Sequence, residues 1–272
     1  MNKPNVVNLH FIDHCNYSCR YCFVKKESKM LSLENIKIII NNIKRYFEIN
    51  KINGRINLVG GEVFICTYLQ EIIDYINSLN IKVSLVTNGS LLTEEFIILN
   101  KEKIETIGIS IDSIDEEINK KIGRCNNGNI IEFDKIVKLC RLIKNNEIKL
   151  KINLCLSKLN CNDDISEFIS LVKPDRFKIF QMTIINGINN KSKNLQLSTN
   201  EFLKSVIKYK KFNPKIEKSK EMKNSYLMVD SKGYLYCNKE EIPLGNLLIE
   251  ECNKLIEFSN IDIKSFNKRY ND

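Results

Sequence analysis

The chain has 272 residues, a net charge of +9 and a hydrophobic content of 43%. This content is enough for one large α/β domain or two small ones, and it excludes a chain that is disordered throughout. The longest mainly apolar stretches, such as residues 36–40 with Lys37 among its isoleucines, fall far short of the roughly 20 residues of a membrane span. The polar first residues are unlike a signal peptide. We therefore expect a cytoplasmic protein without membrane attachment.

Strand-like and helix-like segments alternate over the first two thirds of the chain. The segments rich in β-branched and aromatic residues are 6–12, 55–59, 82–87, 106–111, 149–155 and 176–182. Between the first two, Ile36, Ile39, Ile40, Ile43 and Phe47 recur at helical spacing. Six strand-then-helix units predict a parallel sheet curved into a partial (βα)6 barrel, an incomplete TIM-like barrel.

The pattern changes after a predicted helix at residues 200–211. Residues 226–230 and 234–237 flank a Ser231-Lys232-Gly233 turn and are typical of a β-hairpin. We expect residues 1–212 to form the barrel and residues 213–272 to form a C-terminal extension that caps its mouth.

Strand phase predicts an unusually polar barrel interior. One set of alternating side chains is apolar and faces the helices, so the other set points into the lumen. The lumen set comprises Asn8, His10, Arg55, Asn57, Ser84, Asn88, Gly108, Ser110, Asp112, Lys151, Asn153, Arg176 and Lys178. Buried cations are costly without a counter-charge, so the four basic members indicate a phosphate-bearing ligand or solvent in the lumen. Alternatively, some of them lie at strand ends and reach water.

Three cysteines form a compact loop directly after the first strand. Cys15, Cys19 and Cys22 have spacings of four and three residues, which suit an iron–sulfur cluster or zinc. Zinc would need a fourth ligand, for which His10 and His14 are the candidates. A four-iron, four-sulfur cluster held by three cysteines keeps one iron open for another ligand.

This loop resembles that of the radical S-adenosylmethionine enzymes, with the CxxxCxxC motif and an aromatic residue before its last cysteine. Gly60-Gly61-Glu62 at the end of the second strand is similar to the superfamily's Gly-Gly-Glu-Pro motif, with Val63 in place of proline. We expect the glycines to allow close approach to the cofactor and Glu62 to accept protons of its amino group. The resemblance implies a [4Fe-4S] cluster and S-adenosyl-L-methionine as cofactors.

The chain also resembles the viperin family over nearly its whole length, most closely its prokaryotic members. The matching segments are 10–11, 15–17, 88–90, 110–113, 115–117, 122–124, 151–153, 176–181 and 222–227. For S-adenosylmethionine the resemblance implies the ligands Glu62, Asn88, Ser110 and Arg124. For a nucleoside triphosphate it implies Asn8, Asn57, Lys151, Arg176 and Lys178, with Arg55 where the family has lysine. Tyr226 is implied on the ribose side as a candidate proton donor, and Lys239 is a further candidate for the triphosphate.

The resemblance implies an S-adenosylmethionine-dependent nucleotide dehydratase, a radical SAM lyase. The expected substrate is CTP, with UTP and GTP open, and the product is the 3′-deoxy-3′,4′-didehydro nucleotide, a chain terminator in antiviral defence. The C-terminal extension would then close the nucleotide site. We expect a flavodoxin or ferredoxin as electron donor and a monomeric protein.

Two rival functions remain open. The first is a radical SAM enzyme acting on a peptide or another small molecule; peptide-modifying members often carry a C-terminal cysteine-rich domain, for which Cys237 and Cys252 are too isolated. The second is a non-catalytic cysteine–metal module that binds nucleic acid through its positive charge. The lysines are dispersed, without a block of like charges, so we expect no stable nucleic-acid binding.

Overall fold

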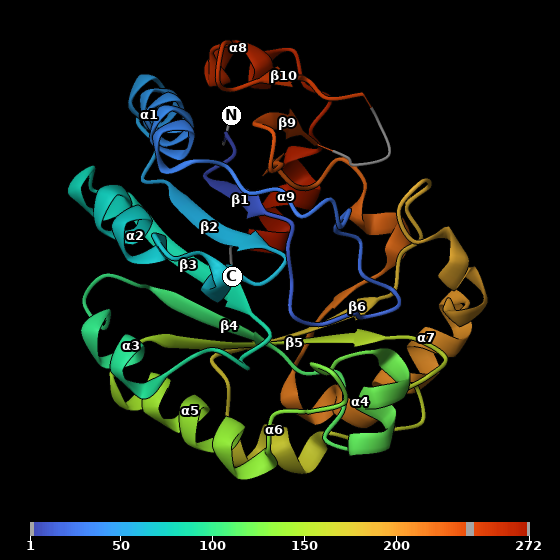
Figure 1. Ribbon diagram of the computed structural model, residues 1–272. Coiled ribbons are helices and arrows are strands. Elements are labelled where there is room, and N and C mark those ends of the chain that lie inside the picture. The colour runs from blue at the N-terminus through green and yellow to red at the C-terminus, as the bar shows by residue number, and fades with distance from the viewer. Residues whose placement is uncertain (1–2, 238–241, 271–272) are drawn as a thin grey trace.

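The computed structural model describes residues 3–237 and 242–270, and a curved parallel sheet dominates the fold (Figure 1). Its six central strands are β1 (Val6–Ile12), β2 (Arg55–Gly60), β3 (Lys82–Thr87), β4 (Thr106–Ser110), β5 (Lys149–Leu156) and β6 (Arg176–Gln181). They pair in chain order, each parallel to the next. The predicted partial (βα)6 barrel is confirmed, with strand ends within one residue of the expected positions.

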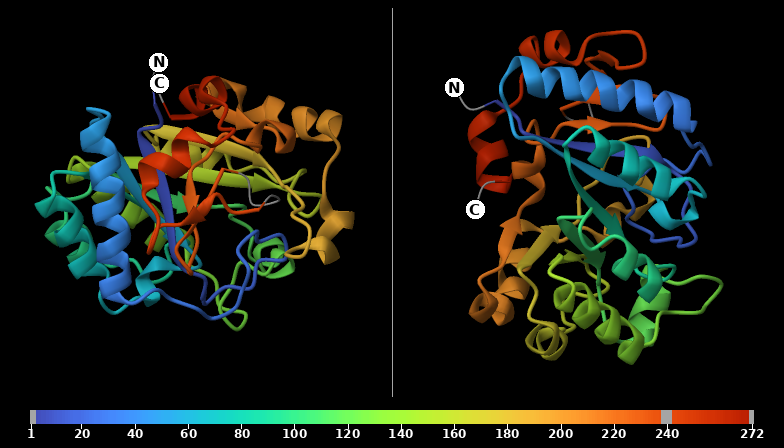
Figure 2. Two further views of the ribbon diagram at one scale, coloured as in Figure 1. Left: turned by 90° about the horizontal axis from the view of Figure 1, so that it is seen from above. Right: turned by 90° about the vertical axis from the view of Figure 1, so that its left-hand side faces the viewer.

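Helices cover the convex face of the sheet (Figures 1 and 2). They are α1 (Leu33–Ile49), α2 (Leu69–Ser78), α3 (Glu94–Leu99), α5 (Phe133–Asn145), α6 (Ser166–Val172) and α7 (Thr199–Val206), while α4 (Glu116–Ile122) follows β4. The predicted apolar stripe of α1 is buried, and it joins the outward side chains of the strands in one core. The predicted helix 200–211 is α7 continued by a 3₁₀ turn, η3 (Ile207–Phe212). Further 3₁₀ turns are η1 (Val63–Ile65), η2 (Asn190–Leu195) and η4 (Ser219–Met222).

The C-terminal extension continues the sheet at both edges. β7 (Lys215–Glu217) pairs parallel to β6, and β8 (Met228–Val229) pairs parallel to β1. The predicted hairpin is present, since β9 (Tyr234–Tyr236) runs antiparallel to β8, and β10 (Gly245–Asn246) follows at the edge. The chain ends in α8 (Cys252–Glu257) and α9 (Ile263–Tyr270). The domain boundary at residues 212 and 213 stays a prediction.

The extension reaches both ends of the barrel. At the hairpin turn, Ser231 Oγ donates a hydrogen bond of 3.2 Å to Asp13 beyond the carboxyl end of β1. At the other end, the last turn of α9 contacts Asn8 and Arg176 in the amino-terminal halves of β1 and β6. Among the described residues, no helix combines the length and apolar character needed to cross a bilayer.

Candidate active site

The cysteine loop is anchored by the end of β2. Gly61 N donates to Ile12 O at 2.8 Å, and Glu62 N donates to His14 O at 2.9 Å. A Cβ atom at Gly60 or at Gly61 would lie 2.0 Å from the carbonyl oxygen of Ile12 or of His14, respectively. The space of their missing side chains is taken by the backbone of the cysteine loop. Close approach of these glycines to the cofactor stays a prediction.

The end of α4 holds the same loop from the opposite side. Ser18 N donates to Gly123 O at 3.0 Å, and Arg20 N donates to Ile122 O at 2.9 Å. Gly123 ends α4 with a φ of 82°, and a Cβ atom there would lie 2.5 Å from Ser18 O. Sequence reasoning matched residues 122–124 to the viperin family without seeing this contact, which depends on a glycine in the left-handed region.

The three cysteine side chains are partly exposed and reduced. Burial raises the pKa of the Cys15 thiol, and it raises that of Cys19 to about 11. Within the described segments, no three His, Cys, Asp or Glu side chains stand close enough to hold a metal ion. Holding a cluster requires the three thiols to lose their protons. Three soft sulfur donors on one loop are nevertheless the donor set that suits iron–sulfur clusters.

Glu62 and Asn88 join the ends of β2 and β3 to the cysteine loop. The Glu62 carboxylate is fully buried and accepts hydrogen bonds from Thr87 Oγ1 at 2.7 Å, Asn88 N at 2.7 Å and Phe64 N at 3.2 Å. Burial raises its pKa against the effect of these donors. Asn88 Nδ2 donates to Asn16 at 2.8 Å and lies 3.9 Å from Cys15 Sγ. Both residues thus organise the loop as well as being candidate cofactor ligands.

Asp112 is an organising residue to which sequence reasoning gave no role. Its Oδ2 accepts hydrogen bonds from Arg124 Nε and from Tyr21 Oη, each at 2.5 Å, and its Oδ1 accepts one from Cys155 N at 2.7 Å. It therefore fixes both Arg124 and the tyrosine inside the CxxxCxxC motif. The position of Asp112 in the predicted lumen set was the available signal.

Three of the four predicted S-adenosylmethionine ligands line one cleft at the carboxyl ends of β3 and β4. Asn88, Ser110 and Arg124 share it with Tyr17 and with apolar side chains that precede and begin α5. Its volume is about 40 Å³. Glu62 lies beneath this cleft, bonded to the backbone of Asn88, and does not line it.

Two of the predicted lumen asparagines, Asn8 and Asn57, form a row across the sheet with Ser84. Asn57 Nδ2 donates to Asn8 Oδ1 at 2.8 Å, and Ser84 Oγ donates to Asn57 Oδ1. Asn8 Nδ2 also donates to the hydroxyl of Tyr270 at 2.7 Å, so the last helix closes this row. The polar side chains that strand phase placed in the lumen therefore form hydrogen bonds with one another on these strands.

Two of the four predicted lumen cations have carboxylate partners that sequence reasoning missed. Lys178 Nζ lies 2.7 Å from Glu217 Oε1 on β7, and Arg55 Nη1 lies 3.0 Å from Glu105 Oε2. Arg55 is the first residue of β2, and its side chain is partly exposed, as the strand-end alternative anticipated. Arg176 Nη2 donates to the backbone oxygen of Arg269.

Lys151 differs from these three cations. Within the described residues its ammonium group makes no hydrogen bond or ion pair, and a Cβ atom at Gly108 would lie 2.7 Å from its Cε. Burial, and next the charges of Lys178, Arg55 and Arg176, lower its pKa to about 7. An anion beside Lys151 would relieve both effects.

Tyr226, the candidate proton donor on the ribose side, lies within a buried ion cluster. Its hydroxyl donates to Glu217 Oε2 at 2.6 Å and accepts from Arg269 Nη1 at 2.6 Å. Neither Glu217 nor Arg269 was among the predicted site residues, and nothing in their local sequence marks them. Lys239 lies outside the described residues.

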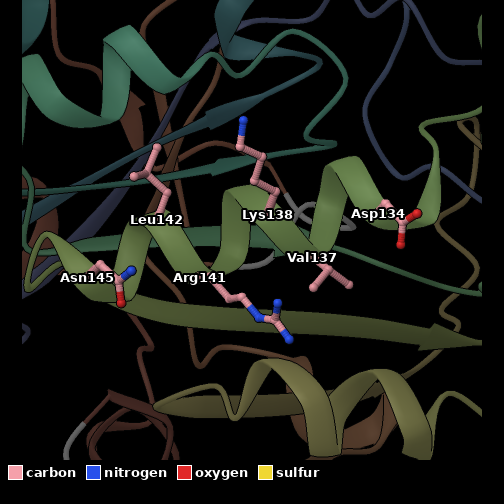
Figure 3. Close-up of a pocket in the computed structure, with 6 residues that line it drawn as sticks. All are labelled: Asp134, Val137, Lys138, Arg141, Leu142 and Asn145. Carbon is pink, nitrogen blue, oxygen red and sulfur yellow. The ribbon is translucent and has the colours of Figure 1, made fainter.

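A separate hollow of about 460 Å³ lies on the outer side of α5 (Figure 3). It is lined by Asp134, Val137, Lys138, Arg141, Leu142 and Asn145. None of these is a predicted site residue, and all belong to α5. The hollow is therefore a surface depression on one helix and not part of the candidate site.

Comparisons with known proteins found a matching family model and named relatives. The family model described as the radical SAM superfamily matches residues 9–172. An S-adenosylmethionine-dependent nucleotide dehydratase of Flammeovirga pacifica is 33% identical over 86% of this chain and 82% of its own length. An S-adenosylmethionine-dependent nucleotide dehydratase RSAD2 of Oncorhynchus mykiss is 30% identical over 98% of this chain and 79% of its own.

Solved structures with low sequence identity share the fold. Streptococcus suis SuiB bound to its precursor peptide SuiA has a TM-score of 0.71 and 16% identity, covering 97% of this chain and 66% of that one. The enzyme anSMEcpe with bound AdoMet and a peptide has a TM-score of 0.70 and 18% identity, covering 97% and 84%. At this identity the likeness concerns the fold alone.

Proposed function

Because the chain belongs to the radical SAM superfamily and, within it, to the viperin family of S-adenosylmethionine-dependent nucleotide dehydratases, we propose that it removes water from a ribonucleoside triphosphate. Its cofactors are those of the superfamily, a [4Fe-4S] cluster and S-adenosyl-L-methionine. The observation that carries the proposed substrate class is Lys151, a partly buried lysine on a lumen strand whose ammonium group makes no hydrogen bond or ion pair within the described residues.

The cysteine loop and the neighbouring cleft are the proposed cofactor site. Cys15, Cys19 and Cys22 hold the cluster in this proposal, while Asn88, Ser110 and Arg124 bind S-adenosylmethionine from the cleft that they line. Glu62, Gly60 and Gly61 are further cofactor-binding residues in this proposal, and the two glycines also set the position of the loop. When bound, the cofactors supply a 5′-deoxyadenosyl radical, and the difficult bond cleavage is their chemistry rather than that of the protein.

The lumen is the proposed nucleotide site. Lys151, Arg176 and Lys178 are the triphosphate ligands, with Arg55 at the strand end, and Asn8 and Asn57 present polar groups beside them. Such ligands position the ribose near the cofactor cleft, which converts a random encounter into an oriented one. After loss of the C4′ hydrogen atom, the 3′ hydroxyl leaves as water, and Tyr226 donates the required proton.

The finer assignments complete the proposal. CTP is the first candidate substrate, and UTP and GTP are alternatives. A flavodoxin or ferredoxin is the proposed electron donor. The 3′-deoxy-3′,4′-didehydro product acts as a chain terminator in antiviral defence. We propose that the enzyme is a lyase, monomeric and cytoplasmic, and does not bind nucleic acid stably. The position of Tyr270, whose hydroxyl accepts a hydrogen bond from Asn8 and whose ring centroid lies 5.8 Å from Lys178 Nζ, argues against a peptide substrate in the lumen.

The decisive experiment supplies the anaerobically reconstituted protein with S-adenosylmethionine, a low-potential reductant and the four ribonucleoside triphosphates. Mass spectrometry should find one nucleotide that has lost a water molecule and one equivalent of 5′-deoxyadenosine. Formation of 5′-deoxyadenosine without a dehydrated nucleotide would refute the substrate class. A colourless zinc protein with salt-sensitive RNA binding would instead support the cysteine–metal module.

A further inference from the structure

The Tyr226 hydroxyl lies between one anion and one cation. It donates its proton to Glu217 Oε2 at 2.6 Å and accepts a hydrogen bond from Arg269 Nη1 at 2.6 Å. The Arg269 guanidinium also lies over the tyrosine ring, 4.0 Å from its centroid. The phenol therefore has a fixed direction, with a cation directly at its oxygen.

Arg269 is itself held firmly. Its Nη2 donates to Glu221 O at 3.0 Å and to Ser225 Oγ at 2.9 Å, and its Nη1 pairs with Glu217. The side chain is 4% exposed. Because the planar guanidinium has several fixed acceptors, it keeps its place when the charge of a neighbouring group changes.

The charges in this cluster favour a protonated tyrosine at rest. Burial alone would raise the pKa of Glu217, but the cations of Lys178 and Arg269 lower it, so the carboxylate is ionised. Burial and the negative charge of Glu217 raise the pKa of Tyr226 well above its ordinary value, while Arg269 acts in the opposite direction. The phenol thus holds a proton, and Arg269 is the group that lowers the cost of releasing it.

We propose that Arg269 is a positioning residue for proton transfer, which orients the Tyr226 phenol and compensates the phenolate that remains after its proton has left. This inference rests on the proposed dehydration. In the step concerned, the C3′–O bond breaks with both electrons on oxygen, and the Tyr226 O–H bond breaks as its proton passes to that oxygen, which leaves as water. The low-potential reductant of the proposed reaction supplies the single electron that then completes the C3′=C4′ double bond.

The first test compares Arg269→Gln with Lys268→Gln, which removes the same charge from an exposed position of the same helix. The measured quantity is the ratio of dehydrated nucleotide to 5′-deoxyadenosine. We expect Arg269→Gln to lower this ratio by about tenfold or more, since a general acid contributes on the order of a hundredfold, and Lys268→Gln to leave it unchanged. An unchanged ratio in Arg269→Gln would overturn the inference. A wild-type protein that dehydrates no nucleotide would refute the proposed function instead.

A double-mutant comparison separates positioning from a merely structural role. In a Tyr226→Phe background, Arg269→Gln should have no further effect on the product ratio, because both changes remove the same proton transfer. Effects that multiply would show that Arg269 acts independently of the tyrosine. If Arg269→Gln does not fold, Arg269→Lys replaces it, because lysine keeps the positive charge but not the planar guanidinium group. Arg269→Lys should lower the product ratio by a smaller factor, and it should have no further effect on this ratio in the Tyr226→Phe background.

A third test needs neither cluster nor turnover. Difluorotyrosine incorporated at position 226 of the apoprotein ionises nearer to neutral pH, and its ¹⁹F signal reports the phenol–phenolate equilibrium. Arg269→Gln should raise the pKa of this phenol by about 1 to 3, the usual effect of losing an adjacent opposite charge. An identical titration in both proteins would contradict the proposed role of Arg269.

Discussion

Lys151 offers the sharpest test of the nucleotide site, because the structure predicts how its contribution depends on pH. Its pKa is lowered from 10.5 to about 7, first by burial and then by neighbouring cations. Above pH 7 the free protein carries a largely neutral Lys151, while a bound triphosphate favours the ammonium form. Nucleotide binding should therefore take up a proton, and each pH unit above 7 should weaken it about tenfold, or about 1.4 kcal/mol.

The assay is titration calorimetry of CTP, UTP and GTP at pH 6, 7, 8 and 9, in two buffers with different ionisation enthalpies. At pH 8 the wild-type protein should take up close to one proton per nucleotide through Lys151, and Lys151→Met should take up none there. Protonation of the triphosphate itself is common to both proteins and cancels in the comparison. Lys149→Met, an exposed position on the same strand, is the matched control and should resemble the wild type.

The same lysine should destabilise the folded state. Its folded pKa of about 7 lies below the unfolded value of 10.5, so between these pH values the unfolded chain binds more protons and stability rises with pH. Lys151→Met removes this destabilisation and should raise the free energy of unfolding at pH 7 by up to about 4 kcal/mol. It should also weaken nucleotide binding about tenfold or more. A variant that binds nucleotide as tightly as the wild type, with the same proton uptake, would remove Lys151 from the site.

Three further predictions concern the groups that support the site. Glu217→Gln leaves two buried cations without their counter-ion and should lower the free energy of unfolding by about 3 kcal/mol in urea titrations, whereas Glu221→Gln at an exposed position should cost less than about 1 kcal/mol. Asp112→Asn should remove the ion pair that holds Arg124, and equilibrium dialysis should show about tenfold weaker binding of S-adenosylmethionine. An unchanged affinity would argue against a role for this contact. Gly61→Ala should displace the cysteine loop and lower the iron and sulfide bound per chain after reconstitution, because its Cβ would lie 2.0 Å from a loop carbonyl oxygen; full loading would contradict that packing.

Much of the fold and part of the site follow from local sequence. The β-branched segments and the helical spacing of Ile36, Ile39 and Ile40 determine which residues form strands and helices, because alternation and helical periodicity depend on neighbours in the chain. The spacing of Cys15, Cys19 and Cys22 brings three sulfur donors into one loop for the same reason. The alternation of side chains along the strands also predicts that Lys151 and Lys178 face the lumen.

The partners of these residues depend on tertiary structure. Glu217 lies 39 residues from Lys178 and 52 residues from Arg269, and the three meet only because β7 joins β6 and α9 returns beside β1. Charge alone therefore could not distinguish the lysine that has a buried counter-ion from Lys151, which has none within the described segments. The sequence by itself determined which side chains enter the lumen, since that depends on alternation along each strand. Only the packing of distant segments decided which of their charges are compensated, because electrostatic partners are set by distance in space and not by position in the chain.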